Sequence, residues 1–581
     1  SLAPPYAIIV GARATGTLRI SELTGWRFLD SMLSAGMLSL HFFMMRNSAF
    51  NTRNVVTPCW LPAALAVVCL LPRAALAVKL DALCNDAVFY INLAQGFEQG
   101  NLNAGLGRMG LNTYPPILAA LHQFGLGWEA AGKWWGVFAA ALAVMPLYGW
   151  VRRQFDDRTA LVAGLLYAFH PKLIEWSPEL LRDPTFWLLC GTSLYCSWRA
   201  ADERQVGWYL TAGISIALAV HTRFEGWFLY LPLVGWTACG VRAACPRSRK
   251  LAGLLLALAM CPTLIVLVNA TALRQHDRWE LGNFDRLQYV MLWWKAAWGP
   301  ERVADGTIVS GTDAGETPTL GADAGGTPPA RMPAKKMLVL YGNAFRRGFG
   351  AIFGIAWLIG FATARRRLLR ADYAVLFFVA GCVAAAAWVH LWYAQATSSR
   401  YFLTIVLLAL PCSATGWLWG YDRLAHLAAR AFQARWVGPA VTVAAIIATA
   451  LAGVGESLAD RHDGRSREAA LGRWLLAEFG PASRIATLGP MPLVGFYAQT
   501  VTSVVGTNDA DFFGPEPDAP VQAIVAVRRG AAAGSVPDFV NAGNERGYRR
   551  VDPARLPTGH DWSDVVVLIA SAPVPCARPS R

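Results

Sequence analysis

The chain has 581 residues and a strongly apolar composition: 55% of the residues are hydrophobic, 15% are charged and 24 are tryptophan. With a mean hydropathy of +0.35, it is too apolar for a soluble globular enzyme of this length, and its long apolar runs exclude a disordered or collagen-like chain. The net charge of +14 does not indicate a nucleic-acid-binding protein, because most basic residues lie in short clusters between apolar segments, where positive charge sets membrane orientation. The composition therefore predicts an integral membrane protein.

Apolar runs of about 20 residues, the length that crosses a bilayer as a helix, recur along most of the chain. We predict about eleven membrane helices, and hence a mainly α fold class, that of a polytopic helical membrane protein. The predicted spans cover residues 59–78, 132–151, 159–176, 184–199, 206–222, 227–241, 251–271, 348–364, 373–393, 401–420 and 436–454.

Basic residues distinguish one set of loops from the other. Alternate loops carry clusters such as Arg152-Arg153 and Arg365–Arg367, whereas the short loops between them hold only isolated basic residues. Loops rich in Lys and Arg stay in the cytoplasm. With an odd number of spans, the sequence predicts a cytoplasmic N-terminus and an extracytoplasmic C-terminal region.

The regions outside the spans complete the predicted domain organisation. Residues 1–54 form a cytoplasmic segment to which we assign no role, and residues 55–454 form the transmembrane domain, with outside loops at 79–131 and 272–347. The second loop contains a polar repeat (311–318 and 321–328) that cannot bury a core, and we interpret it as a flexible insertion. We predict a small extracytoplasmic α/β domain over 455–581, with a helix at 466–479 that ends at Gly480 and β-rich runs at 484–488, 521–528 and 565–570.

The first outside loop opens with an amphipathic helix. Apolar residues recur at helical spacing from Ala87 to Phe97, so we expect this helix to lie along the membrane surface. Asp86 stands at its start. The spacing allows two roles for the Asp86 carboxylate, a cap for the first-turn N–H groups or a catalytic group, and does not separate them.

A second acidic cluster, Glu175, Glu179 and Asp183, lies at the outside junction between the third and fourth predicted spans. Asp183 is followed by Pro184, a pattern typical of a helix N-cap, which is the simpler interpretation. Both acidic positions nevertheless lie on the same outer face. We therefore expect Asp86 and Asp183 to converge over one site.

Four basic residues lie on the same predicted face: Lys172, Arg182, Arg223 and Arg400. An arginine fork suits a phosphate, because it donates paired charge-assisted hydrogen bonds. The alternatives are extension of each side chain from a helix end to the lipid headgroups and, for Arg223, pairing with Glu225. The eleven cysteines contain no C-x-x-C pair and the histidines no H-x-H or H-x-x-H pair, so we expect no metal ion and no other cofactor.

Taken in order, these motifs resemble the C-type glycosyltransferase (GT-C) fold, specifically its bacterial members in the family of the protein O-mannosyltransferases and the lipid A aminoarabinose transferase. The resemblance extends over about residues 59–420. It rests on Asp86–Tyr90 with Ala94 and Gly100, on Tyr114-Pro115-Pro116, on Leu181–Pro184, on Thr222–Gly226 and on Arg400-Tyr401.

The resemblance implies an integral-membrane glycosyltransferase at the outer face of a bacterial plasma (inner) membrane. Its partners would be membrane lipids, a polyprenyl-phosphate-linked sugar donor and an extracytoplasmic acceptor (a lipid, a glycan or a protein), and no nucleic acid. In such enzymes the first-loop aspartate is the base, so Asp86 would deprotonate the acceptor. The acceptor would then attack the anomeric carbon of the sugar and invert its configuration as polyprenyl phosphate leaves. Asp183 is the second catalytic candidate. The substrate-binding candidates are Arg223 and Arg400 for the phosphate, with Lys172 and Arg182 behind them, and Tyr90, Tyr114 and Tyr401.

The sequence departs from the family pattern at two positions. Several relatives carry a second acid after the first-loop aspartate, where this chain has Ala87, and some have lysine where this chain has Tyr114. We therefore expect the handling of donor or acceptor to differ from that of the best-known members. Because Asn85 precedes Asp86, a paired-carboxylate metal site is not expected here.

Two other classes of protein fit the composition. A transporter or lipid flippase would also have many helices, but the strongest polar motifs lie in outside loops and the sequence has no evident internal repeat of helices. A non-catalytic relative would keep the fold and bind a lipid or an assembly partner. An enzyme requires Asp86, Asp183, Arg223 and Arg400 to converge on one outside cavity, whereas a transporter requires a path through the bilayer. The sequence identifies neither the donor sugar nor the acceptor.

Overall fold

The computed structural model describes residues 59–107, 109–203, 205–239, 247–272, 282–283, 291, 332–368, 370–394, 396–433, 436–459, 463–481, 483–488, 491–499, 501–504, 521–527, 536–545 and 547–571. The predicted cytoplasmic segment 1–54 and the polar repeat at 311–328 lie outside these residues. The chain divides into a large unit, Cys59–Arg423 with Ile446–Arg581, and a small unit, Ser1–Pro58 with Leu424–Ala445. The contacts discussed below lie within the large unit.

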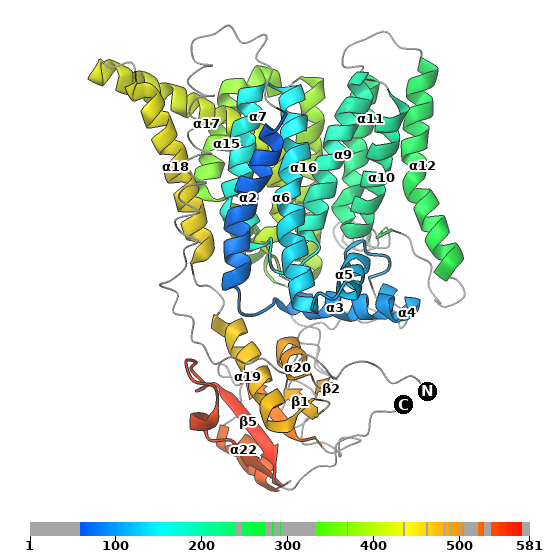
Figure 1. Ribbon diagram of the computed structural model, residues 1–581, viewed down its shortest axis with the longest axis vertical. Coiled ribbons are helices and arrows are strands. Elements are labelled where there is room, and N and C mark those ends of the chain that lie inside the picture. Colours follow the sequence, from blue (N-terminus) through cyan, green and yellow to red (C-terminus); the bar gives the residue numbers. More distant parts are fainter. Residues whose placement is uncertain are drawn as a thin grey trace. The chain divides into compact units, whose positions relative to one another are not determined.

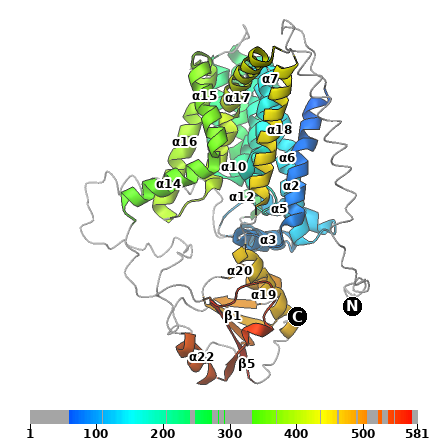
Figure 2. The same cartoon turned by 90° about the vertical axis from the view of Figure 1, so that its left-hand side faces the viewer.

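Six helices of the described part of the chain are long and apolar enough to cross a membrane, and a bent pair of helices raises this number to seven. Helix α6 packs against α2 and α7, and the views in Figures 1 and 2 show these three helices side by side. The six helices are α2 (Leu61–Lys79), α6 (Trp128–Gln154), α12 (Arg247–Ala272), α16 (Ala371–Ala394), α17 (Leu403–Phe432) and α18 (Val437–Leu458).

Four further helices lie where the sequence predicts spans, but they are shorter or less apolar. Because α9 packs against α6 and α10, and α10 packs against α12, much of their surface faces protein rather than lipid, so they do not need an uninterrupted apolar run. The polytopic helical architecture is confirmed, whereas the number eleven is not. These helices are α7 (Asp157–Phe169), α9 (Asp183–Glu203), α10 (Val206–Thr222) and α11 (Tyr230–Cys239), the last preceded by the 3-10 helix η2 (Phe224–Leu229).

The end of the predicted second outside loop is a helix. Helix α14 (Ala334–Phe349) meets α15 (Ala351–Leu368) at 87°, with Gly350 between them. Gly350 has a φ of +71°, a left-handed conformation that ends α14 and that residues with a side chain rarely adopt. Figure 2 shows α14 lying across the direction of α16. Helix α14 packs against the 3-10 turn η4 (Ser399–Phe402), which precedes α17.

Short helices lie at one end of the long helices, in the predicted first outside loop and at the junction before α9 (Figure 1). The first of them buries Ala87, Tyr90, Ile91 and Ala94 together with Leu93 and Gly96, so the predicted helix is present, with more than one buried face. These short helices are α3 (Asn85–Glu98), α4 (Leu102–Leu106), α5 (Tyr114–Gln123) and α8 (Pro171–Glu175).

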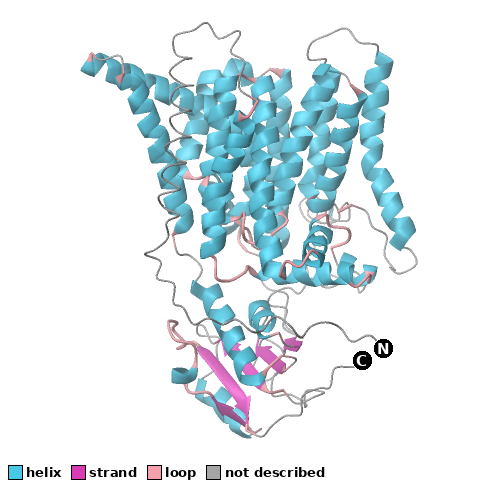
Figure 3. Cartoon of the chain, viewed as in Figure 1, coloured by secondary structure: helices cyan, strands magenta, loops and turns pink. Residues whose placement is uncertain are grey.

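Strands occur, among the described residues, only near the C-terminus, where Figure 3 shows them in magenta. The sheet has the order β2-β1-β3-β5-β4, with β1 parallel to β2 and β3, and β5 antiparallel to β3 and β4. The predicted helix and all three β-rich runs are confirmed, and we call residues 463–571 the C-terminal domain. Its elements are α19 (Asp463–Phe479), β1 (Arg484–Leu488), α20 (Pro492–Ala498), β2 (Val501–Val504), β3 (Ala523–Val527), α22 (Val536–Glu545), β4 (Tyr548–Arg550), η5 (Pro553–Arg555) and β5 (Val565–Ala570).

Candidate functional site

Asp86 lies in the first turn of α3 and pairs with Arg400 of η4. Asp86 Oδ2 and Arg400 Nη2 are 2.6 Å apart. The N-cap of α3 is Cys84, so the interpretation of Asp86 as the helix cap is wrong, although its charge still suits the helix dipole. The Asp86 side chain is 47% exposed and that of Arg400 is 20% exposed. The carboxylate is therefore accessible to a substrate.

A second group of charges is buried. Asp183, the first residue of α9, accepts a hydrogen bond from Arg223 Nη1. Arg223 also donates to both carboxylate oxygens of Glu225 in η2, at 2.6 and 3.2 Å. The side chains of Asp183 and Arg223 are only 3% and 5% exposed. We call Asp183, Arg223 and Glu225 the buried triad.

The aromatic ring of Tyr401 lies between the Asp86–Arg400 pair and the buried triad. The guanidinium carbon of Arg400 is 5.4 Å from the ring centroid, and that of Arg223 is 5.7 Å from it. Both distances are in the range of cation–π attraction. Contacts through Tyr401 thus bring Asp86, Asp183, Arg223 and Arg400 close together, with Asp86 and Arg400 partly exposed and Asp183 and Arg223 buried.

The pKa values in the buried triad are set by competition between burial and pairing. Burial alone would raise the pKa of Glu225, but the Arg223 guanidinium outweighs it and lowers that pKa to about 2. Burial likewise opposes the charge of Arg223, and the two carboxylates overcome this effect and raise its pKa. Glu225 and Arg223 are therefore both charged at neutral pH, each stabilised by the other.

The aromatic rings of Tyr90 in α3 and Tyr114 in α5 pack edge to face, with ring centroids 5.4 Å apart. Burial raises the pKa of both phenols, so both hydroxyls remain protonated. Tyr114 opens α5, with Pro115 and Pro116 following in its first turn. Tyr114 Oη is buried and has no hydrogen-bond partner among the described residues.

The other two basic candidates lie in different surroundings. Arg182 reaches Met109 of the first loop, with Nη1 3.8 Å from the sulfur, and its charge acts on Tyr90 and Glu225. Lys172 instead pairs with Glu175 at 2.5 Å. Arg182 therefore acts on Tyr90 and Glu225 through its charge, whereas Lys172 is held by Glu175.

The loop that carries Asp183 is fitted against glycines of α6. Leu180 is fully buried and has a φ of +57°, a costly conformation for a branched residue. A Cβ atom at Gly132 would lie 2.0 Å from Leu180 Cγ, and one at Gly136 would lie 2.1 Å from the Ser177 carbonyl oxygen. Only glycine at these positions leaves room for the loop.

Three further residues contribute contacts that were not among the site candidates. Glu225 completes the buried triad, and its position two residues after Arg223 was a usable signal. The Trp176 ring lies 5.9 Å from the Arg400 guanidinium carbon. Arg465 of α19 pairs with the buried Glu179 at 2.8 Å, and nothing in the sequence connects these two distant residues.

Part of the chain is similar in sequence to a known protein family, and the fold is similar to that of solved structures. Residues 117–266 match the family of dolichyl-phosphate-mannose-protein mannosyltransferases, a range that includes Asp183 and Arg223 but not Asp86 or Arg400. ArnT from Cupriavidus metallidurans in the apo state is 15% identical with a TM-score of 0.51, over 87% of this chain and 97% of ArnT. The Archaeoglobus fulgidus oligosaccharyltransferase with Zn and sulfate is 15% identical with a TM-score of 0.48, over 80% of this chain and 68% of that one. No curated protein sequence is significantly similar to the chain.

The family match and the fold agree with the resemblance that the motifs carry. The polar motifs lie at one end of a bundle of membrane helices, and a small α/β domain follows this bundle in the sequence. The protein therefore has the GT-C fold, and its residues 117–266 are similar to the family of dolichyl-phosphate-mannose-protein mannosyltransferases.

Proposed function

We propose that the protein is a glycosyltransferase that moves a sugar from a polyprenyl-phosphate donor to an acceptor at the outer face of a bacterial inner membrane. The observation that carries this proposal is the Asp86–Arg400 pair, an accessible carboxylate in contact with a partly exposed arginine. The matched family, whose name includes a lipid-phosphate sugar, supports this donor class. In this orientation the N-terminus is cytoplasmic, and the end of the chain with the C-terminal domain is extracytoplasmic.

The chemistry is a single displacement at the anomeric carbon. Asp86 accepts the proton of the acceptor hydroxyl or amine while the acceptor oxygen or nitrogen forms a bond to that carbon. The bond between the anomeric carbon and the phosphate oxygen breaks, and its electron pair leaves with polyprenyl phosphate. The configuration of the sugar is inverted in this step.

Arg400 is the residue that we assign to the phosphate. It has an accessible guanidinium, and an arginine fork binds phosphate oxygens through paired hydrogen bonds. When the donor phosphate binds Arg400, it competes with Asp86 for the same guanidinium. The Asp86 carboxylate is then released to accept a proton. Donor binding therefore activates the base.

The buried triad has a supporting role in this proposal. Arg223 already has two carboxylate partners and is almost inaccessible, so we assign it to hold Tyr401 and Asp183 rather than to contact phosphate. Tyr401 in turn fixes the side chain of Arg400. Arg182 and Tyr90 complete the wall of the site on the side of α3.

The test is turnover of a panel of polyprenyl-phosphate sugars in proteoliposomes. We expect one donor to be consumed by the native chain, and we expect Asp86→Asn to lower turnover at least about a hundredfold, because it keeps the shape and removes the base. Asp81→Asn is the matched control, since Asp81 lies in the same loop with an exposed side chain. Equal turnover by Asp86→Asn would exclude Asp86 as the base. Lipid movement across the bilayer without sugar transfer would favour a flippase.

A further inference from the structure

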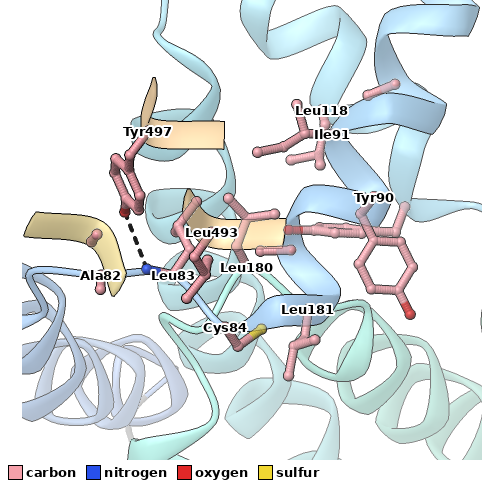
Figure 4. Packing of buried hydrophobic residues seen from close by; sticks show 14 of the residues in the cluster. Ala82, Leu83, Cys84, Tyr90, Ile91, Leu118, Leu180, Leu181, Leu493 and Tyr497 are labelled. Atoms are coloured by element: carbon pink, nitrogen blue, oxygen red, sulfur yellow. Dashed lines mark hydrogen bonds between the residues drawn. The ribbon is translucent and has the colours of Figure 1, made fainter. Parts of the chain in front are cut away.

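The C-terminal domain is bonded to the chain segment that directly precedes Asp86. The Leu83 N–H donates to the Tyr497 hydroxyl oxygen at 3.2 Å, the dashed line in Figure 4. The Asp81 carbonyl accepts a hydrogen bond from Arg473 at 2.8 Å. The guanidinium carbon of Arg473 lies 4.6 Å from the Tyr497 ring centroid. Tyr497 of α20 and Arg473 of α19 therefore hold one short stretch of backbone together.

A shared hydrophobic core lies behind these bonds. Leu493 and Tyr497 of the C-terminal domain belong to the same buried cluster as Leu83 and Leu180, and Figure 4 shows them packed against one another. Leu83, Leu180 and Leu493 have no exposed surface. The cluster also includes Tyr90, which lines the site. Because burial of apolar side chains stabilises the contact between them, this contact is part of the folded core.

A second link passes through Glu179. The Glu179 carboxylate is 1% exposed and accepts hydrogen bonds from Arg465 of α19, with both oxygens 2.8 Å from Nη1. Its backbone carbonyl accepts a hydrogen bond from the Cys84 thiol at 3.0 Å. Burial raises the pKa of Cys84, and the Glu179 and Asp86 charges raise it further, so the thiol stays protonated and able to donate. Arg465 is thus joined through Glu179 to the N-cap of α3.

We infer that the C-terminal domain positions Asp86, with Tyr497, Arg473 and Arg465 as positioning residues. They contact no reacting atom; they fix residues 81–84, and Asp86 follows in the first turn of the helix that Cys84 caps. The domain would in this way be a working part of the site, not only an appended module. The expected effect on turnover rests on the proposed role of Asp86, whereas the expected effect on local order does not.

The first test removes one hydroxyl group. Tyr497→Phe keeps the ring and its packing but removes the acceptor for the Leu83 N–H. Tyr548→Phe is the matched control, because the Tyr548 hydroxyl also hydrogen-bonds a backbone group, donating to the Val521 carbonyl, but within the C-terminal domain itself. Both variants are made in the full chain and reconstituted. Hydrogen exchange of the peptide covering residues 84–90 and steady-state kinetics are measured for each.

We expect Tyr497→Phe to speed exchange in residues 84–90 and to lower kcat about five- to tenfold, the effect of losing one buried hydrogen bond. The KM for the donor should not rise, because Arg400 lies on η4, outside the held segment, and a less firmly held Asp86 competes less with the phosphate. Tyr548→Phe should change neither readout. Exchange and kcat equal in the two variants would overturn the inference. If the native chain consumes no donor, the exchange result still decides it, and the proposed function alone fails.

A second pair of variants tests the Glu179 link. Arg465→Ala removes the arginine that pairs with the buried Glu179, whereas Arg467→Ala removes an ion pair of the same helix that lies within the C-terminal domain, to Asp564. We expect only Arg465→Ala to speed exchange in residues 84–90 and to lower kcat, and Arg465→Lys to restore part of both, because it restores the charge. An equal fall in kcat and an equal rise in exchange for Arg465→Ala and Arg467→Ala would mean that the domain only stabilises the fold, and would contradict the inference.

Discussion

Asp86 and Arg400 form an ion pair of 2.6 Å, although one lies in the first turn of α3 and the other in the turn before α17. A general base that is paired with an arginine is held in place but is also occupied. The proposed exchange of this arginine from carboxylate to phosphate explains how a site can hold its base in the resting state and release it when the donor binds. The predictions below follow from this pair and from the loop and triad around it.

Arg400→Lys tests whether the phosphate is bound by a fork. Lysine keeps the charge but loses the paired hydrogen bonds, so we expect the KM for the donor to rise about tenfold while the protein stays folded. The steady-state kinetics are compared with those of Arg158→Lys, since Arg158 pairs with Asp422 on the protein surface. An unchanged donor KM in Arg400→Lys would contradict a forked contact with the phosphate.

Gly132→Ala tests the fit of the loop that carries Asp183. The new Cβ would lie 2.0 Å from Leu180 Cγ, and Leu180 is fully buried, so the loop must move. We expect a loss of about 1–3 kcal/mol in stability together with a fall in turnover. Gly127→Ala is the control, because nothing lies within 4 Å of a Cβ there. Equal unfolding temperatures for the two variants would contradict the tight fit.

The contacts around Asp86, Arg223 and Glu179 differ in how far they could be predicted from the sequence. The pairing of Arg223 with Glu225 was predictable, because the two residues are separated by one position. The sequence predicted Asp86 and Arg400 on the same outer face, but not the ion pair between them. The contact of Arg465 with Glu179 was not predictable, because it depends on how a separate domain packs against a loop, and no local periodicity encodes that. The number of spans is not confirmed for a similar reason, since helices buried among other helices lack the apolar length of a lipid-facing span.

Glu225→Gln tests the charge of the buried triad through its pH dependence. The folded pKa of Glu225, about 2, lies below the ordinary value of 4.5, so its ionised form stabilises the fold above about pH 4.5, and this contribution is lost as the pH falls toward 2. The ionised Glu225 contributes about 3 kcal/mol to the free energy of unfolding at neutral pH. We expect the native chain to have a higher unfolding temperature than Glu225→Gln at pH 7, with the difference shrinking below pH 4.5.

Glu478→Gln provides the control for this pH series. Glu478 pairs with Arg555 where both side chains are open to solvent, so its removal should leave the unfolding temperature nearly unchanged at every pH. A difference between native chain and Glu225→Gln that stays constant down to pH 3 would show that Glu225 does not stabilise the fold through its charge.

Asp183→Asn tests the other half of the buried triad. Removing one partner of a buried ion pair leaves Arg223 with one carboxylate instead of two, so we expect a loss of about 3–5 kcal/mol in stability. Asp422→Asn removes an exposed pair and should cost less than about 1 kcal/mol. Thermal unfolding of the two variants in the same detergent gives the comparison, and a smaller loss for Asp183→Asn than for Asp422→Asn would contradict a buried, stabilising triad.

The most direct test of the exchange of Arg400 between carboxylate and phosphate is the affinity of Asp86→Asn and Arg400→Ala for the donor. Asp86→Asn removes the competitor for the guanidinium, so it should bind the donor as tightly as the native chain or more tightly, while transferring almost no sugar. Arg400→Ala should bind the donor about tenfold or more weakly, because the charge-assisted hydrogen bonds to phosphate are lost. If both variants lose donor affinity to the same extent, the two residues form only a structural pair, and the proposed mechanism is wrong.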